Sequence, residues 1–364
     1  MKHILIIMIF LLICSCSKTQ QSRTDTGDGS VSDSGAGLSI ESGDFVSDKI
    51  GSFISDMPSA GSEAYVLLDD CDAESFRTLI TNLWKGDTEA MQDAASEVGY
   101  MLLRYNDDEN EDASYLLLVE KEREGQRHQG LFAFNPEGSL NLVIEAPHPK
   151  YETSTGTIAA HIFRETDSKA LFIAGAHRCS DSESSLCSGI TSVCSASNKD
   201  EPFRISDVAH DVCNLFHAAH MALNDVDEKP TFLQIHGKKD NAPEAVFSDG
   251  SMRMATTSSS VLLAKKLMNR IATKSGYDGV ASCQSDESGG IQKGTVLCAT
   301  TNVQGRYTNG VSKSRCCNDA PDDQAITGRF IHIEMSPDLR DAEDDNNDKI
   351  GPDDLIAAIN ETWL

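Results

Sequence analysis

The chain has 364 residues, of which 39% are hydrophobic, so it can bury the core of one large domain, alone or with a smaller companion. Its formal net charge of −26 argues against nucleic acid or an anionic membrane surface as partners, because both need a basic face. An acidic composition suits a soluble exported protein but identifies no activity.

The amino terminus predicts export. Residues 4–14 form an apolar run of eleven residues, which is too short to span a bilayer but is typical of a secretory signal. The run ends in Ile13-Cys14-Ser15-Cys16, which resembles a bacterial lipobox with Cys16 at the lipidated position. Ordinary signal cleavage nearby is the alternative. We expect residues 1–16 to be a lipoprotein-type signal peptide and the mature protein to be a cell-envelope lipoprotein, held to the membrane by its amino terminus alone.

The next two segments differ in composition. Residues 17–44 are mainly Ser, Gly, Asp and Thr, which predicts a flexible linker. Residues 45–137 predict an N-terminal α/β region, either an accessory subdomain or the first strands of the main sheet. Its expected elements are a strand at 65–68, helices at 73–84 and 88–98, and strands at 115–119 and 130–134.

The domain at 138–364 opens with a βαβ unit. An apolar strand before Pro147, a helix over 155–166 and a second apolar strand over 170–176 follow one another in about forty residues. The two strands of such a unit are parallel, so their carboxyl ends share one edge of the sheet, where ligands bind. We therefore expect a convergence at this edge of four side chains that follow the strands, namely His148, Glu152, His177 and Arg178.

Nine cysteines remain after Cys14 and Cys16, so in an exported protein most should form disulfides and one is left over. Proximity in sequence suggests pairing within 179–213 and a bond between Cys283 and Cys298. A zinc-finger role is disfavoured because the sequence contains no C-x-x-C pair.

The remaining elements complete an α/β fold. We expect a long loop over 179–204, a helix over 206–225 with Ser206 as its N-cap, and strands at 231–235, 245–247 and 329–335. Helices are expected at 259–273 and 352–363. The predicted fold class is α/β, with a mixed, largely parallel central sheet, flanking helices and disulfide-supported loops. The acidic segment 341–354 predicts solvated surface, because it lacks the glycine that a calcium loop needs.

Histidines recur at strand ends and point to a catalytic metal. Zinc in enzymes takes three protein ligands from His and Asp or Glu, and His148, Glu152 and His236 supply this set. Glu334, on the 329–335 strand beside His332, could accept a proton from a water molecule that the ion activates.

Alternatives remain open for several positions. Glu145, three residues before His148, rivals Glu152 as the carboxylate ligand. Arg306 or Arg178 could bind a substrate carboxylate through paired hydrogen bonds, and His177 could contact substrate or support a ligand. His210 could play a similar supporting part, whereas packing or capping is expected for His217 and His220.

Several stretches resemble one family. They are VIEAPHPKYETST, AGAHR, SDVAH with FHAAH, QIHGKK, TNVQGRYTNG and HIEMSPDLR, which together lie within 143–340. They look like secreted bacterial proteins related to zinc-dependent N-formylglutamate amidohydrolases and poly-γ-glutamate hydrolases. The resemblance implies a carboxypeptidase-like sheet and hydrolysis of an amide bond next to a carboxylate, in a peptide or an acidic small molecule. His148, Glu152 and His236 match the metal positions and Glu334 the base, although the H-x-x-x-E spacing here departs from the usual H-x-x-E.

Two other function classes compete with a zinc amidohydrolase. A lipoprotein of the same fold could bind a ligand without turnover. A phosphoesterase could use the histidines with Arg178, but the sequence has no Gly-rich phosphate loop and no second clear carboxylate cluster for a paired-metal site. Serine catalysis is disfavoured because no G-x-S-x-G motif surrounds a serine.

Overall fold

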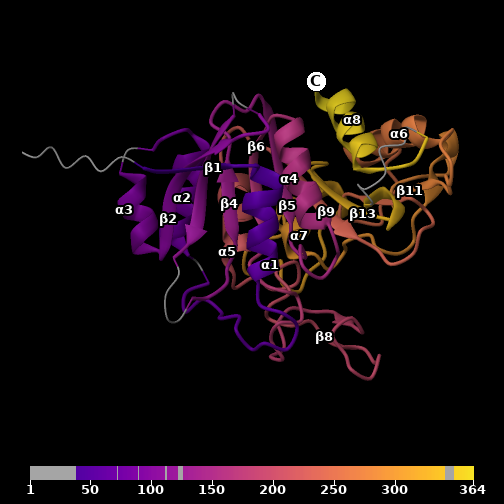
Figure 1. Cartoon of the computed structure of the whole chain (residues 1–364). Coiled ribbons are helices and arrows are strands. Elements are labelled where there is room, and N and C mark those ends of the chain that lie inside the picture. The colour runs from indigo at the N-terminus through magenta and orange to yellow at the C-terminus, as the bar shows by residue number, and fades with distance from the viewer. Residues whose placement is uncertain (1–37, 72, 89, 111–112, 122–125, 341–347) are drawn as a thin grey trace, which may run out of the picture. The chain divides into compact units, whose positions relative to one another are not determined.

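Eleven strands form one sheet in the computed structural model of the protein (Figure 1). The structure describes residues 38–364, apart from 72, 89, 111–112, 122–125 and 341–347. The expected signal peptide, its lipidation site Cys16, and the linker up to residue 37 lie outside the described residues, as does the first half of the acidic segment at 341–354. In its described half, Asp354 is buried and pairs with Lys274, so this part is not fully solvated surface as predicted. No helix in the described part of the chain is long and apolar enough to cross a membrane.

The elements alternate along the chain. The helices are α1 (Ser52–Asp56), α2 (Glu74–Trp84), α3 (Met91–Glu97), α4 (Thr155–Glu165), α5 (Leu215–Asn224), α6 (Ser259–Ile271), α7 (Val303–Thr308) and α8 (Pro352–Trp363), with a π-helical turn η1 (Phe45–Gly51) before α1. The strands of the sheet are β1 (Ser39–Gly43), β2 (Tyr100–Asp107), β3 (Ser114–Glu120), β4 (Leu131–Phe134), β5 (Leu140–Ala146), β6 (Ser168–Ile173), β9 (Thr231–Gly237), β10 (Ala245–Ser248), β11 (Val280–Ser282), β12 (Gln292–Lys293) and β13 (Phe330–Met335). Strands β7 (Ile190–Thr191) and β8 (Glu201–Pro202) form a separate short ribbon.

The middle of the sheet is parallel. The strand order is β1-β2-β3-β4-β6-β5-β9-β13-β10-β11-β12, and β6, β5, β9 and β13 all run in one direction. Their carboxyl ends therefore lie at one edge, as the βαβ pattern predicted. Antiparallel pairs flank this block, at β2-β3-β4-β6 on one side and at β13-β10 on the other. The predicted α/β class with a mixed, largely parallel sheet and flanking helices is confirmed, and strands from 45–137 and 138–364 share the sheet.

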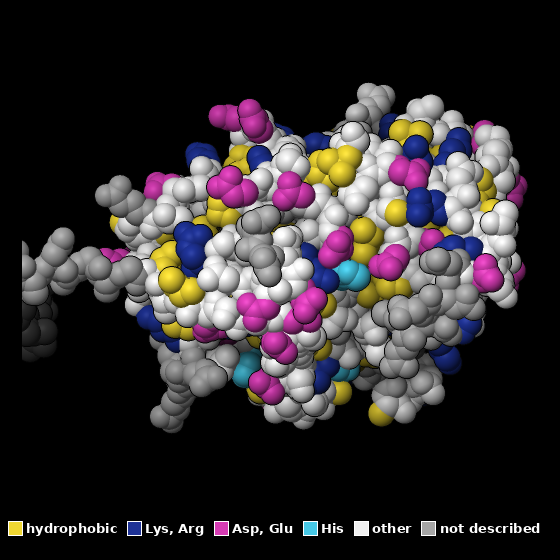
Figure 2. Space-filling view, turned by 45° about the horizontal axis from the view of Figure 1, so that its top comes forward, with side chains coloured by type: hydrophobic (Ala, Val, Ile, Leu, Met, Phe, Trp, Pro, Cys, Tyr) yellow, Lys and Arg dark blue, Asp and Glu magenta, His cyan; other side chains and the backbone are white. Residues whose placement is uncertain are grey.

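Helices cover both faces of the sheet. Side chains alternate between faces along a strand, so β9 turns Leu233 and Ile235 to one face and Phe232 to the other. The first face packs against α4, α6 and α8, and the second against α2, α3 and α5. Figure 2 shows acidic, basic and apolar side chains interspersed on the surface in view, so the negative charge there is spread rather than gathered in one patch.

The side chains on the second face change from apolar to polar along three parallel strands. Its first row, nearest the amino ends, is apolar, whereas the rows toward the carboxyl edge are polar. The register aligns the rows Val143–Phe232–Phe330, Glu145–Gln234–His332 and His236–Glu334 across β5, β9 and β13. Buried polar groups need partners, so this gradient marks the edge of the sheet where partners must be supplied.

Three local predictions are wrong. Residues 39–43, expected in the linker, form β1 and pair with β2, a strand that the sequence analysis did not predict. Residues 65–68 form no strand, because Tyr65 and Leu68 instead pack as an irregular segment into the core under α2. The helix expected from Ser206 starts only at Leu215, where the Asn214 side chain accepts the backbone N–H of His217 as the N-cap.

Four disulfides are present. Cys179–Cys194 and Cys283–Cys298 agree with the pairing expected from proximity. Cys187 and Cys213, expected to pair within 179–213, instead bond across the chain to Cys317 and Cys71. Among the nine cysteines of the described residues, Cys316 is unpaired and buried, in agreement with the odd count. Sequence proximity therefore found the short links but not those that join distant loops.

The core behind the polar edge provides a stability test. Ile235 is fully buried on the face opposite His236, so Ile235→Ala removes packing without touching a polar group. We expect it to lower the free energy of unfolding by about 2–5 kcal/mol in urea titrations. Leu262→Ala, on the exposed side of α6, should change it by less than about 0.5 kcal/mol. Equal effects of the two substitutions would contradict this packing.

Candidate metal centre

His148 and Glu152 lie in the turn between β5 and α4. Pro147 and Pro149 flank the histidine, and the backbone N–H of Glu152 donates to the carbonyl of His148 at 3.0 Å, which closes one turn. That turn places His148 Nδ1 2.9 Å from Glu152 Oε1. Both side chains are buried, so the strand end presents an imidazole and a carboxylate in contact and shielded from bulk water.

His236 completes the group from β9. Its Nδ1 lies 3.2 Å from Glu152 Oε2, and the centroids of the His148 and His236 rings are 4.9 Å apart. The backbone N–H of Gly237 donates to the same Oε2 at 3.0 Å and fixes the carboxylate. The three residues that the sequence analysis chose as metal ligands thus meet, with one ligand atom from each within 4.8 Å of the others.

A chain of hydrogen bonds determines which nitrogen of His236 carries the proton. The Gly305 N–H donates to Asn302 Oδ1, so the Asn302 amide nitrogen is the group that donates to Gln234 Oε1. The Gln234 amide nitrogen in turn donates to Glu145. Gln234 Oε1 can then only accept, at 3.0 Å, from His236 Nε2–H. A neutral His236 therefore turns the lone pair of Nδ1 toward Glu152.

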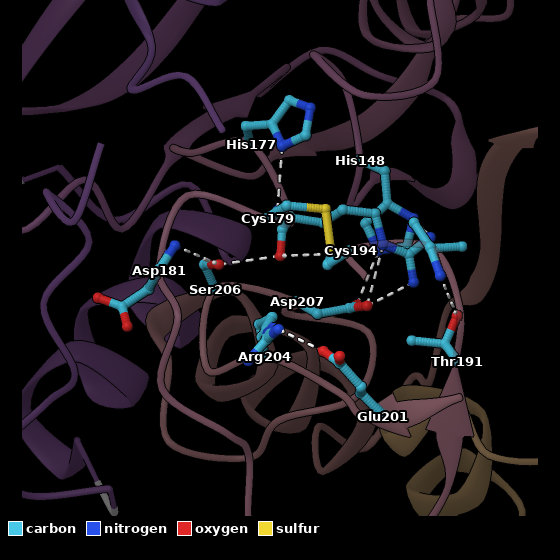
Figure 3. The surroundings of a disulfide bond; sticks show 12 residues. His148, His177, Cys179, Asp181, Thr191, Cys194, Glu201, Arg204, Ser206 and Asp207 are labelled. Carbon is cyan, nitrogen blue, oxygen red and sulfur yellow. Dashed lines mark hydrogen bonds and ion pairs between the residues drawn. A yellow bond between two sulfur atoms is a disulfide. The ribbon is translucent and has the colours of Figure 1, made fainter. Parts of the chain in front are cut away.

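Asp207 orients His148 in the same way, with Nδ1 toward Glu152. The Asp207 carboxylate lies 2.8 Å from His148 Nε2 (Figure 3). It also accepts from Arg178, through Nε at 3.0 Å and through Nη2. A carboxylate can only accept, so Nε2 carries a proton and Nδ1 is the nitrogen left for Glu152. Carboxylates commonly orient metal-binding histidines in this way.

The two Nδ1 atoms and the Glu152 carboxylate therefore favour positive charge beside them. Arg178 Nη1 lies 3.3 Å from His148 Nδ1 and 3.4 Å from Glu152 Oε1 and supplies part of it, and a proton or a metal ion can supply the rest between groups that are 2.9 and 3.2 Å apart. Those separations are close to the roughly 3.3 Å between ligands of a tetrahedral ion with bonds of about 2.0–2.1 Å. The residues fit a divalent cation such as zinc, and the group can bind a metal.

The pKa shifts agree with this charge pattern. Burial and Arg178 oppose a charge on His148, but the carboxylates of Glu152 and Asp207 outweigh them and raise the pKa of His148. Burial alone would raise the pKa of Glu152, yet His148 and His236 hold it well below its usual value. Burial lowers the pKa of His236, so that ring favours its neutral, metal-binding form. Glu152 is consequently the fixed negative charge of the group.

Glu334 and His332 on β13 adjoin the same group. With His236 they form a second set of ligand atoms within 4.8 Å of one another. His332 Nε2 lies 3.5 Å from Glu334 Oε1, while its Nδ1 is buried without a hydrogen-bond partner. Burial, reinforced by the negative charge of Glu152, raises the pKa of Glu334 to about 8. A carboxyl group that exchanges its proton near neutral pH is suited to acid–base chemistry.

The two rival glutamates have separate surroundings. Glu152 lies between His148 and His236. Glu145 instead accepts from His220 Nδ1 at 2.7 Å and from Gln234 at 3.0 Å, both buried. Glu145 therefore reaches His236 only through Gln234, and Glu152 is the carboxylate that the fold brings to the histidines.

The remaining predicted site residues differ in position. Arg178 lines the cavity described below. Arg306 points elsewhere and donates to the backbone carbonyls of Thr300, Cys316 and Cys317. His177 Nδ1 accepts the backbone N–H of Cys179 at 3.0 Å and is not among the cavity-lining residues. His210 lines the cavity, whereas His217 and His220 are buried in α5.

Sequence reasoning missed three residues that support the histidines, namely Asp207, Gln234 and Asn302. Gln234 could have been found, because it lies two residues before His236 and so on the same face of a strand. Asp207 was assigned to the first turn of a helix that begins eight residues later. Asn302 lies in a stretch without periodicity, and only the fold brings it to Gln234.

A cavity of about 280 Å³ opens onto the group. Its polar side contains His148, Glu152, His236, His332 and Glu334. The rest of its lining comes partly from the two loops that Cys179–Cys194 and Cys283–Cys298 close and partly from Arg178, Phe203, His210 and residues 299–302. A small molecule entering the cavity would reach both the candidate metal ligands and Glu334. The arrangement can therefore support chemistry on a ligand held beside an ion.

No protein-family model, curated protein or solved structure matches this chain.

The raised pKa of Glu334 predicts a pH dependence of stability in protein freed of metal by a chelator. The folded state holds the Glu334 proton up to about pH 8, whereas the unfolded chain loses it near its ordinary pKa, so the resulting stability is lost as pH rises through this window. Glu334→Gln cannot ionise, so we expect its free energy of unfolding to fall less than that of the parent between about pH 5 and pH 8.

Urea titrations across that range measure the slope. The exposed Glu137→Gln, at the opposite edge of the sheet, is the control and should keep the slope of the parent. An unchanged slope in Glu334→Gln would show that this carboxyl ionises normally.

Proposed function

We propose that this protein is a zinc-dependent hydrolase that cleaves an amide bond next to a carboxylate. The observation that carries the proposal is the Glu152 carboxylate, whose two oxygens face the Nδ1 atoms of His148 and His236. Two imidazoles and one carboxylate are the donor set of many catalytic zinc sites, which leave a further position for water or substrate.

A bound zinc ion would polarise the amide carbonyl and acidify a water molecule at the site. The residues around it have distinct parts. His148, Glu152 and His236 hold the ion. Asp207 and Gln234 each hold the second nitrogen of one ligating histidine and so keep Nδ1 turned inward. Glu334 accepts a proton from water and returns it to the leaving nitrogen.

Arg178 is the cationic group nearest the ligands. Its Nη1 lies 3.4 Å from Glu152 Oε1, and it belongs to the cavity lining, unlike Arg306. We assign Arg178 to the substrate carboxylate on this basis. Its pairing with Asp207 holds the guanidinium in place and leaves Nη1 directed toward the ligands.

The resemblance to N-formylglutamate amidohydrolases and poly-γ-glutamate hydrolases supports the same reaction class, because their metal positions match the three residues that meet here. A carboxypeptidase-like relationship of the sheet is part of this proposal. The disulfides and the apolar start of the chain support an exported, lipid-anchored protein of the cell envelope.

Metal analysis tests the site directly. Purified protein should carry one equivalent of zinc per chain by mass spectrometry, and Glu152→Gln should lose it because one ligand is neutralised. Glu145→Gln should weaken zinc affinity only about 10–100-fold, since Glu145 acts through Gln234. Glu137→Gln should bind like the parent. Protein that neither carries nor takes up zinc would refute the mechanism.

Turnover separates an enzyme from a protein that only binds its ligand. Glu334→Gln should keep its zinc and its ligand affinity but lower the rate of amide hydrolysis by about 10²–10⁴-fold, because the proton acceptor is gone. Steady-state assays with N-acyl amino acids measure this. If the parent binds such compounds and never hydrolyses them, the chain is a binding protein. Release of phosphate from phosphate esters but no amide cleavage would favour a phosphoesterase.

A further inference from the structure

The cavity beside the ligands has two unlike sides. Away from the histidines and glutamates, the lining includes four apolar side chains, which form the apolar wall of the cavity, and also polar residues. The apolar wall consists of Ile190, Val193, Phe203 and Leu297, and the polar residues include Thr191, Thr300, Thr301 and Asn302. A ligand that fills the cavity would contact the apolar wall, which would then contribute to the choice of its side group.

Three apolar side chains of this wall are exposed to solvent. Ile190 is 63% exposed, Leu297 43% and Val193 38%, so these side chains contribute little to the core. Val193 directly precedes Cys194, and Leu297 directly precedes Cys298, so each disulfide holds one of them beside the cavity. Fixed positions lower the entropic cost of placing apolar groups around a ligand.

The backbone at Leu297 is also unusual for a leucine. Its φ of 60° lies in the left-handed region, where Gly and Asn are at less cost than a larger apolar residue. A leucine therefore occupies a backbone conformation that favours glycine or asparagine. A role for that side chain at the cavity explains this choice of residue.

The charges around the cavity disfavour the binding of a substrate that carries a second carboxylate. Arg178 is the lining residue among those described that has a permanent positive charge, and Asp207 and Glu152 already accept from it. Arg340, which also lies near Glu152, donates to the carbonyls of Lys238 and Ser336. One substrate carboxylate would have to share Arg178 with Asp207 and Glu152. A second would meet Glu152 and Glu334, and Lys238, the cation that acts on Glu334, donates to the Asp240 carbonyl and is not among the lining residues.

We propose that the side group next to the cleaved amide is apolar, of the size of leucine, valine or methionine, and that the substrate carries a single carboxylate. This inference rests on the proposed hydrolase function and narrows its substrate class. N-acyl derivatives of apolar amino acids, or dipeptides with such a residue, are the ligands that fit. The diacid N-acylglutamates, which the family resemblance alone would suggest, fit poorly.

Ligand binding to zinc-loaded Glu334→Gln tests this without turnover. Calorimetric titration with N-acetyl-L-leucine and N-acetyl-L-glutamate should show at least about 10-fold tighter binding of the leucine compound, the scale on which apolar pockets discriminate. Equal affinity, tighter binding of the glutamate compound, or binding of neither would overturn the proposal.

A second variant locates the preference. Leu297→Asn, added to Glu334→Gln, removes the apolar side chain while Asn tolerates the positive φ, so the fold is retained. It should weaken N-acetyl-L-leucine binding about 10-fold and leave N-acetylglycine unchanged. Leu262→Asn, another exposed leucine that lies on α6 outside the cavity lining, is the matched control and should alter neither. If Leu297→Asn binds the leucine compound as its parent does, the apolar wall is not the specificity site.

The two proposals fail separately. Apolar preference in Glu334→Gln, with no hydrolysis by the parent, would refute the enzyme and leave the apolar pocket as a binding site. Hydrolysis of N-acetyl-L-glutamate faster than N-acetyl-L-leucine would keep the enzyme and refute the apolar pocket.

Discussion

The contact on which the site depends is that of one buried carboxylate with two imidazole nitrogens. Glu152 turns an oxygen to His148 and the other to His236, and both nitrogens are held there by acceptors on their far sides. Such an arrangement is unfavourable unless a positive charge lies between the groups. The protein therefore has a place in its interior that favours a cation, and the local protonation pattern follows from that requirement.

This cation-favouring group exists because one face of the sheet is polar near the carboxyl ends of β5, β9 and β13. Val143, Phe232 and Phe330 pack against helices like any core residues, but the next rows are Glu145, Gln234 and His332, then His236 and Glu334. Their partners come from the covering helices and the loops beside them: His220 of α5 binds Glu145, Thr308 of α7 binds His220, and Asn302, the N-cap of α7, binds Gln234. Hydrogen bonds therefore fix the orientation of Glu145, Gln234 and His236 on this face, whereas His332 Nδ1 has no partner.

Opposite this polar face, two loops closed by disulfides bring apolar side chains to the cavity. Neither loop has much regular structure, so the covalent links replace the hydrogen-bond ladders that would hold a helix or strand. In the proposed enzyme, the polar sheet face would perform the reaction and the apolar wall, held by the disulfides, would contribute to the choice of ligand. The resemblance to acid-specific amidohydrolases concerns only the sheet face, because its matching residues are the proposed metal ligands and the proposed base.

The sequence by itself determined the α/β class, the parallel strands with histidine at or after their ends, and the trio His148, Glu152 and His236. Periodicity and strand direction decide these features, since apolar strands followed by polar turns place those turns at one edge. Even there, the sequence left Glu145 and Glu152 as rivals, because spacing along a chain does not say which carboxylate turns back toward a histidine.

Only the tertiary structure decided the rest. Asp207 reaches His148 from a loop that the sequence predicted as helix, and Asn302 reaches Gln234 from 68 residues away. Cys71–Cys213 and Cys187–Cys317 join positions that no local pattern relates. Such contacts depend on how the sheet, helices and loops pack in three dimensions, and periodicity along the chain carries no information about partners supplied by another element.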